Sequence, residues 1–265
     1  MMFPKRQSDI YGQLKIVKGS KEYVLPAAWA LKDAGSYDFK AKLADNAFVH
    51  GSEVTGDKKA KGHTIQVEFN LSGATEEEHD EAMNMAYSYF TMTDYQLFCG
   101  RADRYYQVAG LSKIKHEYEK GFKQRMSKVT VSLLCAKPFR YSAVPTIIEK
   151  NFASDQKETE IIINNTSSVE VPLIWSFAPS DGKSTPDITI VHAESGQSFT
   201  LKDTLLTAPA VAVVNAESGT VRRDTGNSLN TFSGLFLFAE PGQNTYKYTG
   251  AACNITIQYT GRWYI

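Results

Sequence analysis

Histidine, cysteine and carboxylate side chains could bind metals or catalyse reactions, but their spacing in this sequence points to neither chemistry. None of the five histidines recurs at i, i+3 or i+4, so no helix can present two imidazoles to one metal ion. The chain also lacks the glycine-rich phosphate-binding loops, the GxSxG nucleophile turn and the HExxH zinc motif. We therefore expect no catalytic residue, no cofactor and no metal site, and not an enzyme.

The segment 50–63 is the first candidate for a contact with a partner. It contains three glycines and the cations Lys58, Lys59 and Lys61, and it is too polar to belong to a core. Because it lies between two strand-like segments, we expect a long mobile loop. Its three lysines could contact a neighbouring subunit or an acidic partner, and the alternative is a solvated hairpin tip.

Aromatic side chains near the C-terminus are a second candidate, for sugar binding. The residues that could stack on a sugar ring are Trp175, Trp263, Tyr246, Tyr248 and Tyr264. Trp175 belongs to a row of alternating apolar residues, however, and this position favours a place in the core over one on the surface.

The elements that position these residues are mostly strands. Apolar and polar residues alternate along 64–70 and 128–135, and this pattern is typical of half-buried strands. Weaker alternation predicts strands over 104–109 and 113–119, with a hairpin turn at Lys120 and Gly121. Cys135 and Cys253 lie on such rows and Cys99 is far from both, so we expect buried thiols and no disulfide framework.

One helix interrupts the strands of the N-terminal half. Thr75 and Glu78 have the spacing of a capping box, and the acidic residues of the first turn favour the positive end of the helix dipole. His79, Met83 and Phe90 then fall on one apolar face. This face predicts packing against a sheet, so we interpret the helix as structural.

The chain divides into two predicted domains. Residues 1–140 form the first, and residues 141–150 form a linker in which prolines interrupt any strand ladder. Residues 151–265 form the second, with short strands and intervening turns that indicate a jelly-roll-like sandwich. The strands are expected at 160–163, 169–177, 187–192, 198–203, 210–214, 219–223, 235–238, 245–249 and 253–259. Pro172 marks its strand as an edge or a bulge, and 215–219 is expected to be a hairpin loop.

Charge and hydropathy limit the partners and the compartment that we expect for this protein. The 265 residues carry 29 basic and 29 acidic side chains, a net charge of zero that disfavours a dedicated nucleic-acid binder. Residues 1–145 hold 21 Lys and Arg against 17 Asp and Glu, and the remainder has the opposite bias. The basic start lacks a following apolar run and no segment is long enough to span a bilayer, so we expect no membrane association and folding in a reducing cytoplasm.

The order of these elements resembles the siphophage distal tail proteins, the baseplate hub family abbreviated Dit. In the N-terminal half the matching features are Val49-His50-Gly51 before the polar loop, the strand 64–71, the capped helix 75–92, Tyr95-Gln96-Leu97-Phe98, the strand 104–108, and the strand 129–136 followed by Pro138-Phe139-Arg140-Tyr141. In the C-terminal half they are 161–166, the hairpin 213–221, the turn Pro241-Gly242-Gln243-Asn244, and the strand 255–259 with Arg262. Asn215 departs from the family, which usually has an acidic residue there.

The resemblance implies a mainly β fold with an N-terminal, tail-tube-like β-sandwich that has one α-helix, and a C-terminal galectin-like jelly-roll β-sandwich. It also implies a homo-oligomer, a hexameric ring, at the tail tip of a virion assembled in the bacterial cytoplasm. The ring would contact the tail tube protein, the tail-associated lysin or fibre, and receptor-binding proteins. The alternative that we retain is a carbohydrate-binding virion lectin acting through the C-terminal sandwich.

A ring is consistent with two features of the sequence. Closure would pair sheet edges such as the one we expect along 64–71, and the head-to-tail contacts of a ring need a distinct patch on each side. We expect Lys58, Lys59 and Lys61 to supply one of these patches. The near-neutral charge also suits a channel through which DNA passes without being held.

Overall fold

The longest strands of the N-terminal half follow the alternation of the sequence. In the computed structural model, which describes residues 13–45, 50–57, 59–180, 184–185 and 187–264, β6 (His63–Ser72) pairs antiparallel with β10 (Met126–Cys135). Apolar residues of both strands point to the same buried side, with Val67 opposite Val131. Strand β9 (Gly110–Tyr118) pairs with the other side of β10 across a hairpin loop, so all three predicted strands are confirmed.

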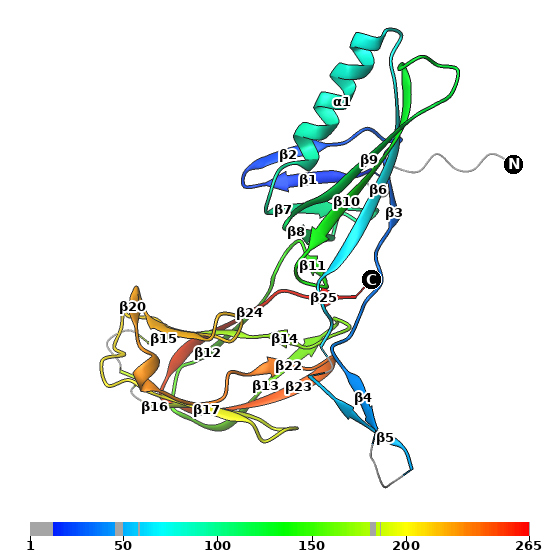
Figure 1. Ribbon diagram of the computed structural model, residues 1–265. Coiled ribbons are helices and arrows are strands. Elements are labelled where there is room, and N and C mark those ends of the chain that lie inside the picture. The colour runs from blue at the N-terminus through cyan, green and yellow to red at the C-terminus, as the bar shows by residue number, and fades with distance from the viewer. Residues whose placement is uncertain (1–12, 46–49, 58, 181–183, 186, 265) are drawn as a thin grey trace, which may run out of the picture. The chain divides into compact units, whose positions relative to one another are not determined.

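The strands of the first unit, residues 1–143 with 264–265, form two sheets and a separate two-stranded ribbon, which we call the arm. One sheet has the order β3-β6-β10-β9, with β3 at Ala30–Asp33. The strands of the other, in the order β2-β1-β7-β8-β11, are β2 (Lys21–Val24), β1 (Lys15–Lys18), β7 (Tyr95–Phe98), β8 (Arg104–Val108) and β11 (Arg140–Ser142). Their inward side chains share one buried cluster, so the unit is a β-sandwich. The remaining pair, β4 (Lys42–Asp45) and β5 (Ser52–Thr55), forms a separate ribbon (Figure 1).

Helix α1 (Glu76–Phe90) begins and packs as its sequence predicts. The Thr75 hydroxyl accepts a hydrogen bond from the Glu78 N–H at 3.1 Å, while the Glu78 carboxylate accepts one from the Ala74 N–H at 2.8 Å. The buried face of the helix consists of His79, Met83, Ala86 and Phe90. Phe90 stacks near Phe69 of β6, so the helix covers part of the sheet's apolar face and has the structural role expected of it.

The second unit, residues 144–263, is a two-sheet sandwich of many short strands. One sheet, in the order β12-β24-β15-β18-β19-β20, contains β12 (Thr146–Phe152), β24 (Cys253–Tyr259), β15 (Ile174–Pro179), β18 (Ala212–Asn215), β19 (Thr220–Arg223) and β20 (Gly226–Asn227). The other, in the order β13-β23-β16-β17-β21, contains β13 (Gln156–Asn165), β23 (Gly242–Gly250), β16 (Asp187–His192), β17 (Ser198–Lys202) and β21 (Phe232–Gly234). The short elements β14 (Val171–Pro172), β22 (Phe238–Ala239), β25 (Arg262–Trp263) and a 3₁₀ turn (Leu229–Thr231) complete the unit.

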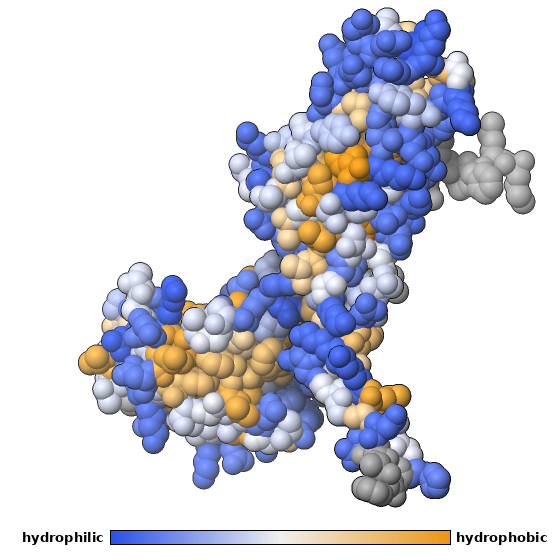
Figure 2. Space-filling model, in the orientation of Figure 1, coloured by the Kyte–Doolittle hydropathy of each residue, from blue (hydrophilic) through white to orange (hydrophobic). Residues whose placement is uncertain are grey.

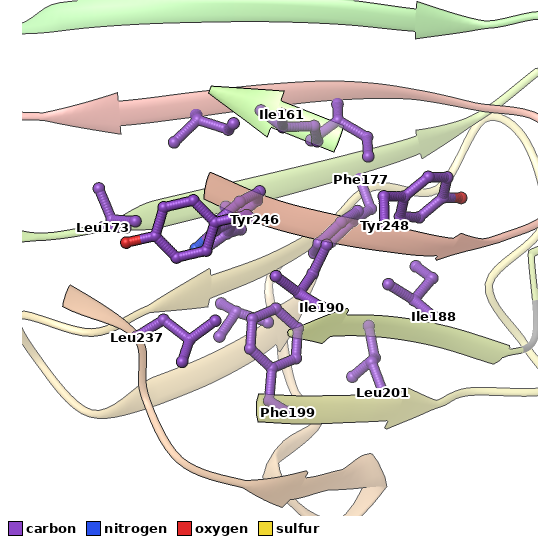
Figure 3. Packing of buried hydrophobic residues seen from close by; sticks show 14 of the residues in the cluster. Ile161, Leu173, Phe177, Ile188, Ile190, Phe199, Leu201, Leu237, Tyr246 and Tyr248 are labelled. Atoms are coloured by element: carbon purple, nitrogen blue, oxygen red, sulfur yellow. The ribbon is translucent and has the colours of Figure 1, made fainter. Parts of the chain in front are cut away.

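The core of this sandwich consists of the inward rows of both sheets (Figure 3). Trp175 is fully buried and meets Tyr246 of the opposite sheet edge to face, with ring centroids 5.4 Å apart. Phe177 lies in a similar relation to Phe199. The mainly β fold expected from the sequence is therefore confirmed, with α1 as the one α-helix among the described residues.

Three segments differ from the expected strands. The row 169–177 is two strands, because Pro172 has no N–H to continue a ladder and Leu173 bonds instead to Leu237 and Ala216. Of the strand expected at 235–238, only Phe238 belongs to a strand, β22, while β21 ends before this segment at Gly234. The expected linker 141–150 contains residues of β11 and most of β12, the latter paired with β24 despite the nearby Pro145.

The three cysteines are buried and form no disulfide. Burial raises the pKa of Cys135 to about 12, and burial likewise raises that of Cys253 to about 12. These thiols are therefore packing residues, as their rows predicted. Within the described part of the chain, no helix is both long and apolar enough to cross a membrane.

Candidate assembly surfaces

The β4–β5 arm is an exposed element of the first unit. Its strands pair antiparallel in the register Lys42 with Thr55 and Leu43 with Val54, and no third strand joins them among the described residues. All eight strand residues are exposed. A two-stranded ribbon is marginally stable by itself, so this arm lacks the apolar burial that stabilises the rest of the unit.

The base of the arm is fixed by backbone hydrogen bonds. The Lys40 N–H donates to the Lys59 carbonyl at 2.9 Å, and the Lys61 N–H donates to the Asp38 carbonyl at 2.8 Å. Gly56 adopts a φ of +93°, and a Cβ there would lie 2.5 Å from the Lys40 carbonyl oxygen. Only glycine fits this close approach, so the glycine-rich composition of the segment has a structural cause.

Apolar side chains lie on the surface of this polar ribbon. Leu43 is 72% exposed and Val54, opposite it, is 54% exposed, and orange residues appear on the arm in Figure 2. Within the described structure, each of these two aliphatic side chains leaves more than half of its area exposed. The pair is therefore a candidate for a contact that buries this area against another protein surface.

The structure places two of the three predicted contact lysines. Lys59 and Lys61 are exposed at the base of the arm, whereas Lys58 lies outside the described residues. The Lys59 N–H donates to the Asp57 carboxylate, and this hydrogen bond lowers the pKa of Asp57. The long loop expected over 50–63 was wrong in part, because Ser52–Thr55 is a paired strand. The pair Leu43 and Val54 was missed, since each is a single apolar residue in a short polar segment.

Strand β9 is a second surface suited to assembly. It is nine residues long and pairs only with β10, which leaves its other edge open within the described structure. The sequence placed an open edge on 64–71 instead. This was wrong in part, because β10 covers one side of β6 and β3 covers Gln66–Glu68 on the other. An open edge of this length can accept a strand from another chain.

The polar face of the same sheet has paired charges. Glu68 lies between Lys128, at 2.9 Å, and Lys32, at 2.5 Å, and the hydrogen bonds from these two lysines lower the pKa of its carboxyl to about 2. Lys115 pairs with Glu117 at 2.8 Å. A hollow of about 240 Å³ on this face is lined by charged residues that include Lys32, Lys113, Lys115, Glu117 and Lys128. The face is therefore mildly basic, with most of its lysines already paired.

The structure excludes three of the five aromatic residues considered for sugar binding. Tyr246 and Tyr248 are fully buried in the second unit, as is Trp175, so none of the three can stack on a ligand. The Trp263 indole N–H donates to the Thr166 carbonyl at 3.3 Å. Tyr264 packs in the first unit against Tyr37, at 5.3 Å between ring centroids. The expectation that Tyr246 and Tyr248 could stack on sugar was wrong.

Metal-binding geometry is also lacking where the structure is described. No three His, Cys, Asp or Glu side chains among those residues are close enough together to hold an ion. The candidate surfaces therefore consist of exposed apolar residues, an open strand edge and charged residues, all of which suit contact with macromolecules better than chemistry on a small molecule.

Comparisons with known proteins identify the fold. No family model matches the sequence, and no curated protein matches it. Among solved structures, the crystal structure of the SPP1 Dit (gp 19.1) protein matches with a TM-score of 0.72 and 14% identity, over 94% of this chain and 98% of that one. It is described as a paradigm of the hub adsorption apparatus in phages that infect Gram-positive hosts. A chain of the phage P2 baseplate matches with a TM-score of 0.44 and 11% identity, over 94% of this chain and 97% of that one. The chain described here therefore has the fold of the SPP1 Dit protein.

Proposed function

We propose that this protein is a structural component of a phage or prophage tail tip, a ring-forming baseplate hub adaptor without catalytic activity. The observation that carries the proposal is the shared fold with SPP1 Dit across nearly the full length of both chains. The adaptor joins the tail tube to the tail-associated lysin or fibre and to receptor-binding proteins. It is made in the bacterial cytoplasm and functions in the virion, with the first unit forming the ring and the second unit supplying a second domain.

The arm and the open β9 edge are the proposed subunit contacts. A head-to-tail ring, here a hexamer, requires each copy to present two different surfaces. Leu43 and Val54 bury their exposed area against the neighbouring copy, and Lys58, Lys59 and Lys61 pair with its acidic side chains. Burial of two aliphatic side chains is worth about 3 kcal/mol per contact, and six such contacts in a ring act together.

The polar face of the β3-β6-β10-β9 sheet is the proposed lining of the central channel. Its opposite face packs into the core, so this is the face available to solvent. Glu68 pairs with two of the lysines, and Glu117 pairs with a third. Because these pairs reduce the free positive charge, DNA can pass without the strong phosphate binding that a lysine-rich surface would produce.

The test is the assembly state of the purified full-length chain, measured by light scattering and electron microscopy. We expect rings with a central hole, and we expect Leu43→Glu with Val54→Glu to convert them to smaller species. Leu205→Glu in the second unit is the matched control, because Leu205 is 67% exposed and lies outside the arm. Replacement of Lys58, Lys59 and Lys61 by Glu should weaken assembly at moderate salt.

Two results would contradict the proposal. A monodisperse monomer at high protein concentration would exclude ring formation by the chain alone. Rings that persist in the Leu43 and Val54 variant, while the Leu205 control behaves identically, would remove the arm from the contact. The alternative function, a virion lectin, is not favoured by any observation here, because three of its five candidate aromatic residues lie in the core.

A further inference from the structure

The second unit contains a hollow of about 380 Å³ that none of the features above explains. Leu235, Phe236 and Phe238 form an apolar wall along one side. Leu235 is 55% exposed, so this wall is open to solvent. Two exposed carboxylates, Glu170 and Glu240, lie at the same hollow. Apolar and acidic groups therefore line one cavity, and the combination suits a ligand that has both an apolar and a cationic part.

The two carboxylates lie at the same end of a short strand pair. Val171 pairs with Ala239 and Pro172 with Phe238 in antiparallel register, so Glu170 and Glu240 occupy the next opposing positions. Residues opposed in this way have Cβ atoms about 5 Å apart, and like charges there repel. Neither carboxylate has an ion pair or hydrogen bond to any described residue. Among the described residues, no cation offsets these two charges.

His192, which also lines the hollow, contacts other residues of the second unit. His192 is buried, and its ring stacks on Tyr246 with centroids 4.8 Å apart. Its Nδ1 lies 2.7 Å from the Ser195 hydroxyl, and its Nε2 lies 3.1 Å from the Glu194 carboxylate. Glu194 in turn accepts a hydrogen bond from the Thr245 N–H at 2.8 Å. The unmatched charge of the hollow is therefore negative and comes from Glu170 and Glu240.

We propose that this hollow binds a partner polypeptide through a lysine or arginine side chain flanked by an apolar residue. The cation bonds both carboxylates and relieves their repulsion, and charge-assisted hydrogen bonds of this kind are the strong ones in proteins. The aliphatic stem and the neighbouring apolar residue pack on Leu235, Phe236 and Phe238. A neutral sugar could use the aromatic rings but would leave the repulsion in place, so a basic peptide fits better. This inference does not depend on ring formation.

Binding of short peptides to the full-length protein tests the proposal by calorimetry or NMR. The probe is acetyl-Gly-Phe-Lys-Leu-Gly-amide, and its matched control has norleucine in place of lysine. We expect the lysine peptide to bind about tenfold more tightly or better, as a hydrogen bond to a charged group predicts. Glu170→Gln with Glu240→Gln should reduce its affinity to that of the norleucine peptide. Glu149→Gln with Glu160→Gln, which changes the net charge equally on exposed residues elsewhere in the unit, should not.

The stability of the unliganded protein is a second readout. Glu170→Gln or Glu240→Gln alone should raise the melting temperature, because either change removes one of two repelling charges, and high salt should reduce the gain. Equal affinity for the two peptides would overturn the proposal. So would a lower melting temperature in both single variants, since this would mean that the carboxylates stabilise the fold. Lactose binding that survives in the double glutamine variant would assign the hollow to sugar instead.

Discussion

A buried carboxylate in the second unit has its charge compensated by one cation. Asp203 is 2% exposed, and both of its carboxylate oxygens contact the Arg223 guanidinium, one at 2.7 Å. The Ser228 hydroxyl also donates to it at 3.0 Å. Arg223→Ala would leave the carboxylate buried without its cation, and we expect a loss of about 3 kcal/mol in the free energy of unfolding.

Urea unfolding of the full-length chain checks this expectation. Arg222→Ala is the control, because Arg222 is the adjacent cation on the same strand and is exposed. It should change the free energy of unfolding by less than about 0.5 kcal/mol. Similar losses in both variants would mean that the Arg223 side chain contributes only packing, and not compensation of the buried charge.

Histidines of the first unit should make its stability depend on pH. Burial lowers the pKa of His63, and burial together with the nearby His79 lowers that of His116. The unfolded chain, with histidines titrating near 6.5, therefore binds more protons than the folded chain as the pH falls below that value. Stability should decrease between about pH 7.5 and about pH 5.5.

Thermal melts across this range test the pH dependence. A variant with His63→Gln and His116→Gln should lose less stability on acidification than the natural chain does. Glu68 contributes at lower pH. Its pKa is lowered from 4.5 to about 2, so the stability that its ion pairs provide is lost only as the pH falls below about 4.5. If the natural chain and the variant lose the same stability on acidification, the two histidines are not the cause of the pH dependence.

Individual side chains were predictable where alternation is strong. Trp175 and Cys135 lie on clear apolar rows and are buried as expected. Tyr246 and Tyr248 were considered for stacking on a sugar. They alternate with Lys247 in β23, however, and this alternation places them on the inward row with Asn244. Tyrosine hydroxyls suggest exposure, but here each bonds a backbone carbonyl at the edge of the core, and this satisfies the polar group.

The start of α1 provides a prediction at the scale of an element. Thr75→Ala would leave the Glu78 N–H without its acceptor, and we expect a loss of about 1 kcal/mol in stability. Thr75→Ser keeps the hydroxyl and should recover most of this loss. Hydrogen exchange of the first helical turn locates the effect, and unchanged protection there in the alanine variant would contradict it.

The pairing of β4 with β5 in the arm should depend on Gly56. Gly56→Ala places a Cβ against the Lys40 carbonyl at a positive φ, so β4 and β5 should separate while the sandwich core stays intact. Gly51→Ala is the control for backbone strain alone, since Gly51 also has a positive φ but has no atom near its Cβ position. Limited proteolysis should cleave the arm faster in the Gly56 variant, and equal cleavage in both variants would attribute the effect to strain.

The elements recognised from the sequence are those buried on one side. β16 and β24 have the predicted bounds, because each alternates cleanly between core and solvent. β4 and β5 are exposed on both sides and show no such alternation, so they could not be separated from a loop. β12 was missed because Pro145 precedes it and most of its residues are exposed. Because β4 and β5 show no alternation, the sequence identified the lysines of the arm as a contact candidate but not its apolar pair, Leu43 and Val54.

At the scale of the whole molecule, the C-terminus returns to the first unit. Tyr264 follows directly after the second unit in sequence, yet it belongs to the first by its contacts. Its ring lies 5.3 Å from Tyr37, 5.9 Å from Phe39 and 5.4 Å from Phe139. Phe39 also precedes the arm and bridges to Ala60, so Tyr264 stabilises the base of an element formed near the start of the chain.

Tyr264→Ala should therefore destabilise the first unit and leave the second unchanged. Loss of three aromatic contacts is expected to cost about 2 kcal/mol, and Tyr264→Phe, which keeps the ring, should cost much less. Hydrogen exchange separates the units, because β6 and β10 report on the first and β23 and β24 on the second. Faster exchange in the alanine variant should be confined to the first unit and to the residues flanking the arm. If exchange accelerates in β23 and β24 instead, Tyr264 stabilises the unit it follows in sequence, and the C-terminus has no role in the base of the arm.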